Sequence, residues 1–579
     1  MTVPLVAAIE RIDDIPLLLA QMEKLKLAKL LDEEFPMHGN WDGLSFGNLV
    51  QVWLAYILSE GDHRLNHVES WASGLLITLK KCLAQEVCAL DFSDDRLARL
   101  LDSLGLDDKF DAFESKLGQT ILRVYDLKAK RARVDSTTVK SYRAAVTEDG
   151  LFQFGHSKDH RPDLPQLKIN QSALDPLGIP LTTTIVSGEK ADDPLYIPEI
   201  SKVQKIINAP GVLFIGDCKM ASFETRAYVA SSGDYYLCPL SAVQMPPSAL
   251  AELLLPVWRD EQALSDVYRP KQEPDEALEK IAAGFTYTTT LQIEKDGEIV
   301  EWNEQRLVVH SLKHAAKQEK KLAAEVDGAQ QAIAKLNKRG RGIKRLNQKE
   351  LEAAVNAILK KYNVCGLLKI EYREQITQTP CPANNDHEST ILIQRTPTVH
   401  TELDKDAWRN AVRNLGWRVF VCNDSELTLS EAVLAYRQEF LIEHNFARYK
   451  GKTLGLTPVY LSSETRIKGL IRLLSIGLRV LCLLEFTVRQ TLRTKEEKLS
   501  GIYKGNKNRA TDSPTAEMML QVFRGLSLII MNINGKQHTE VSPLTAVQEK
   551  ILMLLAQPKS VYIGLSKDFT ELPGDLSER

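Results

Sequence analysis

The spacing of apolar residues changes along the chain, and this change limits the folds that the sequence can adopt. Residues 1–125 carry apolar residues at helical spacing, with Gly, Asp and Asn at the breaks. From residue 131 onward, short runs typical of strands alternate with a helical segment and lead to the apolar run Val212–Gly216. This order predicts a helical region followed by an α/β domain.

The α/β pattern is interrupted after residue 241 and returns at residues 416–423. Within the interruption we expect a hairpin that turns at Asp296-Gly297, and a pair of helices near 311–336 and 347–361. The sequence therefore predicts an α/β core interrupted by a β-rich and helical insertion, with helical N- and C-terminal regions. The expected segments are 1–125 (helical), 126–241 (first part of the core), 242–410 (insertion), 411–465 (end of the core) and 466–579 (helical).

The most apolar stretch of the chain, Gly469–Val488, contains Arg472, Arg479 and Glu485. Three charged residues argue against a membrane span and favour a packed amphipathic helix. The N-terminus lacks the basic start and long apolar run of a signal peptide, and the eight cysteines form no CxxC pair. We therefore expect a cytoplasmic protein with reduced thiols and no membrane partner.

The charge of the whole chain does not indicate a nucleic-acid partner, because 73 basic and 76 acidic residues give a formal net charge of −3. Local basic clusters occur at 128–133, at 335–345 and at Arg466, Lys468, Arg472 and Arg479. Each cluster is as consistent with a solvated surface as with a DNA backbone.

Two aspartates occupy positions that suit catalysis in an α/β sheet. Asp217 follows the run Val212–Gly216, at the carboxyl end of an expected strand, where catalytic groups gather. Asp135 lies inside the strand-like run Arg131–Lys140, where a buried carboxylate needs a partner or a metal ion. Taken singly, each aspartate is more often a structural residue than part of a site.

A helix is expected to begin at Thr428, which forms a capping box with Glu431, and to continue to residue 450. At about 100° per residue, four side chains of this helix share one narrow stripe. They are Tyr436, Glu439, Glu443 and Lys450. A solvated polar face is one interpretation, but the stripe follows a buried strand and lies between aromatic and aliphatic positions, which favours a site.

The segment Tyr436-x2-Glu439-x3-Glu443-x6-Lys450 resembles the Y-x2-R-x3-E-x6-K signature of one branch of the DDE insertion-sequence transposases. In that signature the glutamate is the third metal ligand. The segments VDSTTV and IGDCKM resemble those that supply the first and second aspartates, in the same order, and GHSKDHRPDLPQ resembles a loop of one subgroup. The chain departs from the signature at Glu439, where the family has an arginine.

The resemblance implies a ribonuclease-H-like core, a mixed sheet with flanking helices, in which the two aspartates lie on adjacent central strands and the glutamate on a helix beside them. Asp135, Asp217 and Glu443 would then be the catalytic residues and hold two Mg²⁺ ions, with Mn²⁺ as a substitute. Carboxylates suit this role because hard cations prefer oxygen ligands, and two ions neutralise charge on the attacking and leaving oxygens. A minor alternative is that Glu439 joins the metal site.

The function implied is that of a transposase, an endonuclease that also performs strand transfer. It would bind double-stranded DNA at terminal inverted repeats, through residues 1–125 among others, cleave the ends and join them to target DNA. Bringing two ends together implies a homodimer on DNA. Two alternatives remain: a ribonuclease-H-like nuclease without strand transfer, and a catalytically decayed DNA-binding protein.

The residues expected to contact DNA are Tyr436, Lys450, His156, Lys158, Arg161 and Trp302. The resemblance assigns the first two to the backbone near the cleaved end. The three loop residues face DNA in one interpretation and belong to a plain surface loop in another, while a zinc site with His160 lacks a framing helix or CxxC pair. Trp302 could stack on an unpaired base, although a lone hairpin tryptophan is more often part of a core.

Overall fold

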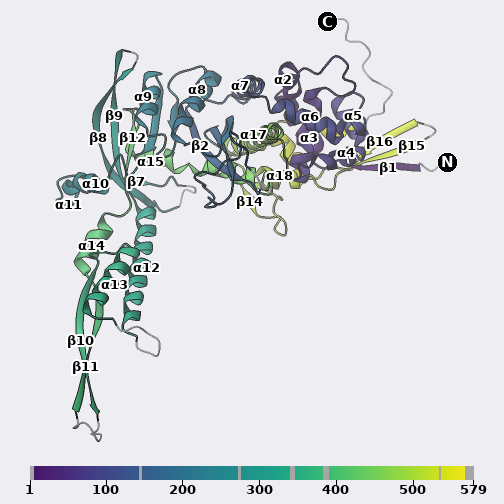
Figure 1. Cartoon of the computed structure of the whole chain (residues 1–579). Coiled ribbons are helices and arrows are strands. Elements are labelled where there is room, and N and C mark those ends of the chain that lie inside the picture. Colours follow the sequence, from purple (N-terminus) through teal and green to yellow (C-terminus); the bar gives the residue numbers. More distant parts are fainter. Residues whose placement is uncertain are drawn as a thin grey trace. The chain divides into compact units, whose positions relative to one another are not determined.

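The computed structural model is a mixed α/β protein that describes residues 5–142, 146–271, 276–295, 297–338, 346–381, 390–533 and 536–566. The chain divides into two compact units, whose elements are labelled in Figure 1. The first unit contains Met1–Cys238 and Tyr436–Arg579, and the second contains Pro239–Ala435. The first unit is thus built from both ends of the chain.

The N-terminal part of the first unit is a bundle of helices that follows the apolar spacing of the sequence. The helices are α1 (Ile15–Lys24), α2 (Leu27–Glu34), α3 (Phe46–Glu60), α4 (Leu65–Ser73), α5 (Leu76–Leu83), the 3-10 helix η1 (Ala89–Phe92), α6 (Asp94–Leu104) and α7 (Asp107–Val124). Helix α3 lies at the centre of the bundle and begins at Ser45, whose hydroxyl accepts a hydrogen bond from the Asn48 amide. Most of its side chains are buried, because other helices cover it on several sides.

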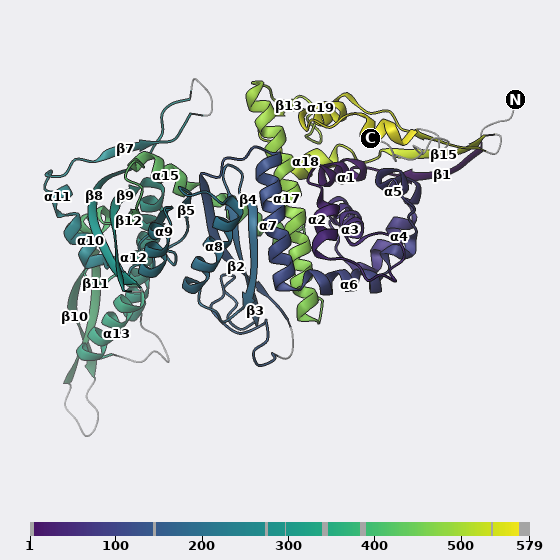
Figure 2. The same ribbon diagram turned by 90° about the horizontal axis from the view of Figure 1, so that it is seen from above.

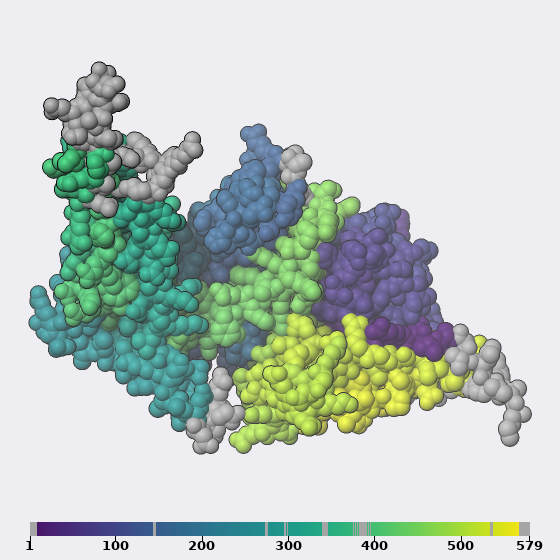
Figure 3. All heavy atoms as spheres, turned by 90° about the horizontal axis from the view of Figure 1, so that it is seen from below, coloured from purple at the N-terminus to yellow at the C-terminus, as the bar shows by residue number. Residues whose placement is uncertain are grey.

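The C-terminal part of the first unit contains more strands than the sequence predicts. Its elements are α16 (Phe440–Lys450), α17 (Glu464–Thr494), β13 (Leu499–Ser500), β14 (Ala510–Thr511), α18 (Ala516–Gln521), β15 (Ser527–Ile533), β16 (Lys536–Val541), α19 (Ala546–Leu554), α20 (Ser560–Ile563) and η3 (Gly564–Ser566). Strand β15 pairs with β16 and with β1 (Leu5–Arg11). Figure 3 has β1 in purple against the yellow C-terminal residues. The expectation of helical terminal regions missed these strands, because strands distant in sequence supply each other's hydrogen bonds.

The sheet of the first unit has the strand order β4-β3-β2-β5-β6. The strands are β2 (Arg131–Lys140), β3 (Gln166–Leu174), β4 (Ile179–Ser187), β5 (Leu213–Ile215) and β6 (Tyr235–Pro239). Strand β3 is antiparallel to its neighbours β2 and β4, whereas β5 is parallel to β2 and to β6. The helical segments that connect the later strands are η2 (Asp193–Leu195), α8 (Tyr196–Ile207) and α9 (Phe223–Ser231). The middle strand, β2, therefore has an antiparallel and a parallel neighbour.

Helix α17 is largely buried along its apolar stretch. It contacts β4 of the sheet as well as α3 and α6 of the N-terminal bundle, and Figure 2 shows it between these parts. The charged residues within its apolar stretch are buried and paired: Arg479 with Glu114, and Glu485 with Arg448. The expected packed amphipathic helix is confirmed. In the described part of the chain, no helix has both the length and the apolarity needed to cross a membrane.

The basic residues of α17 point toward neighbouring helices. Arg466 pairs with Asp102 and Lys468 with Asp107. Arg472 also pairs with Asp107 and donates to the Leu104 carbonyl oxygen. Carboxylates of α6 and α7 hold these cations, which favours the structural interpretation of the cluster over the DNA-facing one.

The second unit combines an antiparallel sheet, of order β12-β9-β8-β7, with helices and a two-stranded ribbon. Its elements are α10 (Pro247–Leu253), α11 (Leu255–Trp258), β7 (Ser265–Tyr268), β8 (Lys280–Lys295), β9 (Glu298–Ser311), α12 (Leu312–Leu336), α13 (Gln348–Lys361), β10 (Leu368–Cys381), β11 (Thr390–Leu403), α14 (Lys405–Arg413), β12 (Trp417–Cys422) and α15 (Leu429–Arg437). Strands β10 and β11 form the ribbon. Because β12 lies in this unit, the unit extends beyond the insertion expected at 242–410.

The predicted hairpin and helical pair of the insertion are present. Strands β8 and β9 pair up to Lys295 and Glu298, and Gly297 has φ 82°, a value that favours glycine. Asp296 lies outside the described residues, as do residues 339–345 of the expected basic cluster at 335–345. Helix α13 begins with a capping box between Asn347 and Glu350.

The pair formed by Arg479 and Glu114 gives a direct test of the fold. Both side chains are almost fully buried, so Arg479→Met leaves the Glu114 carboxylate without its counter-ion. We expect a loss of about 3–5 kcal/mol in the free energy of unfolding, measured by urea denaturation. The control Arg466→Met removes an exposed pair and should cost less than about 1 kcal/mol. Equal losses in the two variants would contradict this view of α17.

Candidate functional site

Asp135 and Asp217 are brought level by the parallel pairing of β2 with β5. The register pairs Arg131 with Leu213 and Arg133 with Ile215. If this register is continued for two more residues, Asp135 lies opposite Asp217, just beyond the carboxyl end of β5. Side chains at alternate positions of a strand point to the same face, so both carboxylates project from one face of the sheet.

Asp217 is held in a tight turn after β5. Its Oδ1 accepts hydrogen bonds from the Tyr196 hydroxyl at 2.7 Å and from the Lys219 amide at 2.8 Å. Burial, followed by the negative charge of Asp217, raises the pKa of Tyr196 well above its usual value, so the phenol stays protonated as a donor. A side chain at Gly216 would collide with Met220 and Tyr196, which explains the glycine before Asp217.

Asp135 is compensated by a lysine from the loop that precedes β3. Lys158 Nζ lies 3.0 Å from Asp135 Oδ1, and the Ser136 amide donates to the same oxygen at 2.7 Å. Burial raises the pKa of the Asp135 carboxyl, and Lys158 lowers it while Asp217 raises it further. The two aspartates are therefore close enough to repel each other, and Lys158 offsets part of that repulsion.

The helix expected from Thr428 to Lys450 is broken in the middle. The capping box of Thr428 and Glu431 is present at the start of α15, which ends at Arg437. The amides of Glu439 and Leu441 donate to carbonyls three residues back instead of four, and α16 begins after this turn. The stripe calculated for one continuous helix is therefore wrong across this break.

Helix α16 packs on β2 and places two glutamates near the aspartates. Ile442 is buried against Ala173 of the sheet. Glu439 is half-buried and lines a small cavity together with Asp135, whereas Glu443, one turn further, is exposed. Burial and then the charge of Asp135 raise the pKa of Glu439 to about 7, with further contributions from Glu443 and Asp217. Asp135 and Glu439 therefore line the same cavity, and the charges of Asp217 and Glu443 also act on the Glu439 carboxyl.

This donor set is chemically suited to a divalent cation. Carboxylate oxygens are the ligands that Mg²⁺ and Mn²⁺ prefer, and the mutual repulsion of the four acids favours a cation between them. Among the described residues, no three His, Cys, Asp or Glu side chains converge closely enough to enclose an ion. Lys158, a cation, donates to Asp135 Oδ1, whereas Tyr196, a neutral donor, donates to Asp217 Oδ1. The types of donor suit the cation, but the acidic side chains would have to move closer together and Lys158 would have to leave Asp135 Oδ1 for an ion to bind there.

The loop Gly155–Gln166 brings two of the predicted DNA-contacting lysines into ion pairs. Lys158 meets Asp135, and Lys450 of α16 lies 3.1 Å from Asp159 Oδ1. Arg161 pairs with Asp163, three residues from the end of the loop. The loop is thus joined to the site at two points.

The other predicted DNA-contacting residues have different settings. His156 and His160 are both exposed on the loop, and no grouping of metal ligands occurs there among the described residues. Tyr436 is half-buried and its hydroxyl hydrogen-bonds the Glu439 carboxylate. Trp302 lies on β9 opposite Leu291 and is only 9% exposed. This burial favours the interpretation of Trp302 as a core residue over base stacking.

Sequence reasoning missed two residues that support the site. Tyr196, the donor to Asp217, begins α8, and its neighbours in the sequence gave no signal. Arg133 is buried two residues before Asp135 on the same face of β2, and it forms a two-pronged ion pair with Asp175 at 2.8 and 2.9 Å. It also donates to Gln438 Oε1 at 3.5 Å, beside the break before α16. Alternation along β2 could have placed Arg133 next to the site.

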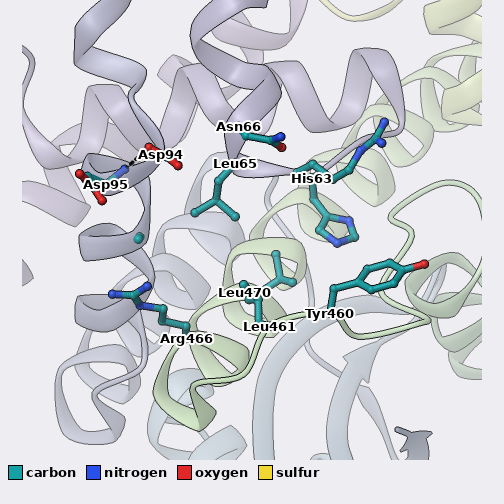
Figure 4. Close-up of a pocket in the computed structure, with 11 residues that line it drawn as sticks. His63, Leu65, Asn66, Asp94, Asp95, Tyr460, Leu461, Arg466 and Leu470 are labelled. Atoms are coloured by element: carbon teal, nitrogen blue, oxygen red, sulfur yellow. Dashed lines mark hydrogen bonds between the residues drawn. The ribbon is translucent and has the colours of Figure 1, made fainter. Parts of the chain in front are cut away.

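A separate pocket of the first unit lies between α4, α6 and the start of α17 (Figure 4). His63 and Tyr460 lie close together at one end of it, and Asp94, Asp95 and Arg466 lie at the other. Its cations already have partners, since Arg64 pairs with Asp62 and Arg466 with Asp102. None of the four acids of the candidate site lines this pocket, and its mixed lining selects no class of ligand.

The raised pKa of Glu439 predicts a pH-dependent stability in metal-free buffer. Below pH 4.5 the carboxyl is protonated in both folded and unfolded chains. As the pH rises from there through about 7, the unfolded chain ionises first and the folded state loses stability. Glu439→Gln should therefore match the parent near pH 4 and exceed its free energy of unfolding at pH 8 by about 2–3 kcal/mol. Urea denaturation at both pH values tests this, and a constant difference would contradict it.

Comparison with known families finds a match to a domain of unknown function, DUF4277, over residues 7–115. This stretch covers β1 and most of the N-terminal helical bundle, and it excludes all four acids of the candidate site. No curated protein matches the chain.

Proposed function

We propose that this protein is a DDE transposase of an insertion sequence, which cleaves DNA at terminal inverted repeats and joins the ends to a target. The observation that supports this most is the level placement of Asp135 and Asp217 on adjacent parallel strands, with α16 packed on β2 beside them. A ribonuclease-H-like catalytic core is expected to have this arrangement. The match to a domain of unknown function is neutral on this point.

In the proposed site, Asp135, Asp217 and Glu443 are the ligands of two Mg²⁺ ions, and Mn²⁺ can substitute. When bound, such ions activate a water or 3′-hydroxyl and stabilise the leaving oxygen. Tyr196 orients the Asp217 carboxylate through its hydrogen bond to Oδ1. Lys450, on the same helix as Glu443, would contact a backbone phosphate near the cleaved end once it leaves Asp159.

Glu439 stands where the family signature has an arginine. The raised pKa of its carboxyl and its contact with Tyr436 explain how the proposed site could accommodate an acid at this position. Its pKa of about 7 means that a large fraction of this carboxyl is protonated near neutral pH. A neutral carboxyl repels DNA less than an ionised one, and the Tyr436 hydroxyl holds it in place. The same replacement also keeps the alternative of a decayed DNA-binding protein open, so a test must separate binding from cleavage.

The decisive test uses the full-length protein and duplexes made from the DNA that flanks its gene, with Mg²⁺ or Mn²⁺. We expect nicked and joined products, and Asp135→Asn, Asp217→Asn and Glu443→Gln should each reduce them at least about hundredfold. Asp108→Asn changes an exposed aspartate of α7 in the same way and should leave product formation unchanged.

The outcomes separate the three functions. Nicked products without joined ones favour a nuclease that lacks strand transfer. Binding without any product favours the decayed DNA-binding protein. Equal products from the parent and Asp135→Asn would remove the proposed active site.

A second prediction concerns Lys450 and the DNA backbone. If Lys450 neutralises one phosphate, Lys450→Met should make the slope of log K against log salt less steep by about 0.9. Fluorescence anisotropy with a labelled duplex at several salt concentrations measures this slope. Lys205→Met removes an exposed lysine of α8 and should leave the slope unchanged. An unchanged slope in Lys450→Met would contradict a phosphate contact.

A further inference from the structure

Lys158 places a single positive charge among the aspartates of the candidate site. Its ammonium group donates to Asp135 Oδ1 at 3.0 Å and to the Ser136 carbonyl oxygen at 2.6 Å. The charges of Asp192 and Asp217 also act on it. Its side chain is 29% exposed, so the group is partly withdrawn from water. The same negative charges that attract the Lys158 ammonium group would therefore attract a metal ion at this position.

The loop that carries Lys158 is fastened so that this position is maintained. Asp159, the next residue, pairs with Lys450 of α16 at 3.1 Å. The Gln166 side chain donates to the His156 carbonyl oxygen at 2.8 Å, and the Ser157 hydroxyl accepts from the Arg161 amide at 3.2 Å. Consecutive residues of one loop thus hold the first aspartate of the site and a lysine of α16.

The contact between Lys158 and Asp135 conflicts with metal ligation at the same oxygen. A carboxylate oxygen binds Mg²⁺ at about 2.0–2.1 Å, and the ion keeps an octahedral shell of ligands and waters. An ammonium group 3.0 Å from that oxygen occupies space in this shell and repels the ion. The two cations therefore compete for Asp135.

We propose that Lys158 is a built-in counter-ion that holds Asp135 in the metal-free protein, and that the loop Gly155–Gln166 must release it when the divalent cation binds. This inference rests on the proposed function, because it takes Asp135 to be a metal ligand. The exchange replaces one cation by another, so Asp135 remains compensated in both states. Once released, Lys158 is free to meet a phosphate of bound DNA.

The test measures Mn²⁺ binding to the full-length protein without DNA, by calorimetry and by the loss of the free Mn²⁺ electron paramagnetic resonance signal. Lys158→Met removes the competing charge and should tighten Mn²⁺ binding by about three- to tenfold, the range expected for one partly buried ion pair. Lys158→Arg keeps the charge and should stay within about twofold of the parent, because the ion pair is retained.

A matched control is Lys202→Met on α8. Lys202 has a similar exposure, 27%, and a similar ion pair, 2.8 Å to Asp111 Oδ2, but it does not contact Asp135. Its Mn²⁺ affinity should equal that of the parent. Asp135→Asn identifies the site, because it should abolish the binding that Lys158→Met strengthens.

Hydrogen exchange provides a second readout that does not depend on affinity. In the parent, adding Mn²⁺ should speed amide exchange in peptides that span Gly155–Gln166, because the loop loses its contact at Asp135. In Lys158→Met this exchange should be fast before metal is added and should change little afterwards. The circular dichroism spectrum of each variant verifies that it is folded.

The outcomes distinguish this inference from the proposed function. Binding that depends on Asp135 but is equal or weaker in Lys158→Met overturns the counter-ion role and leaves the metal site standing. No Asp135-dependent binding in either protein overturns both. Tighter binding in Lys158→Met, together with metal-dependent exchange of the loop in the parent, supports the exchange of Lys158 for the metal.

Discussion

The first unit depends on the buried ion pair of Arg479 with Glu114, which joins three parts of the chain. Arg479, on α17, also donates to the Pro180 and Leu181 carbonyl oxygens at 3.1 and 2.8 Å. Glu114, on α7, accepts from the Thr183 amide at 3.1 Å. Buried charges are costly unless their hydrogen bonds are satisfied, so α17, α7 and β4 must meet in one arrangement. The N-terminal bundle is thereby fixed to the edge of the sheet.

The same helix fixes the element that carries the two glutamates of the site. Arg448 of α16 pairs with Glu485 of α17 and with Glu517 of α18. The Tyr449 hydroxyl donates to the Ile471 carbonyl oxygen at 2.7 Å, and Asn445 donates to that of Gly178 at 2.6 Å. Arg448, Tyr449 and Asn445 are buried, whereas Glu443 is exposed, so α16 is held on the side opposite Glu443. A site built on packed elements keeps its geometry better than one built on loops.

Local patterns predicted the elements well where local forces decide the structure. The apolar run before Asp217 gave β5, and the capping box of Thr428 and Glu431 gave the start of α15. The break at Gln438 and Glu439 could not be predicted, because nothing in the sequence there opposes a helix. It occurs where the chain passes from the second unit to the first, and Arg133 of β2 reaches Gln438 at this point. The inward direction of the basic residues of α17 likewise depends on partners such as Asp102 and Asp107, more than 350 residues away in sequence.

The positions of the two aspartates in the sheet were therefore more predictable than the donors that compensate the acids of the site. The sequence identifies the acids, but it cannot reveal that Lys158 offsets Asp135, that Tyr196 binds Asp217, or that Tyr436 binds Glu439. These donors come from elements that only the fold brings together. They also allow four acids to share a site in the metal-free protein, since each contact lowers the cost of their mutual repulsion. An internal cation and neutral donors thus stabilise these acids in the folded chain, and the proposed competition between Lys158 and a divalent ion starts from this balance.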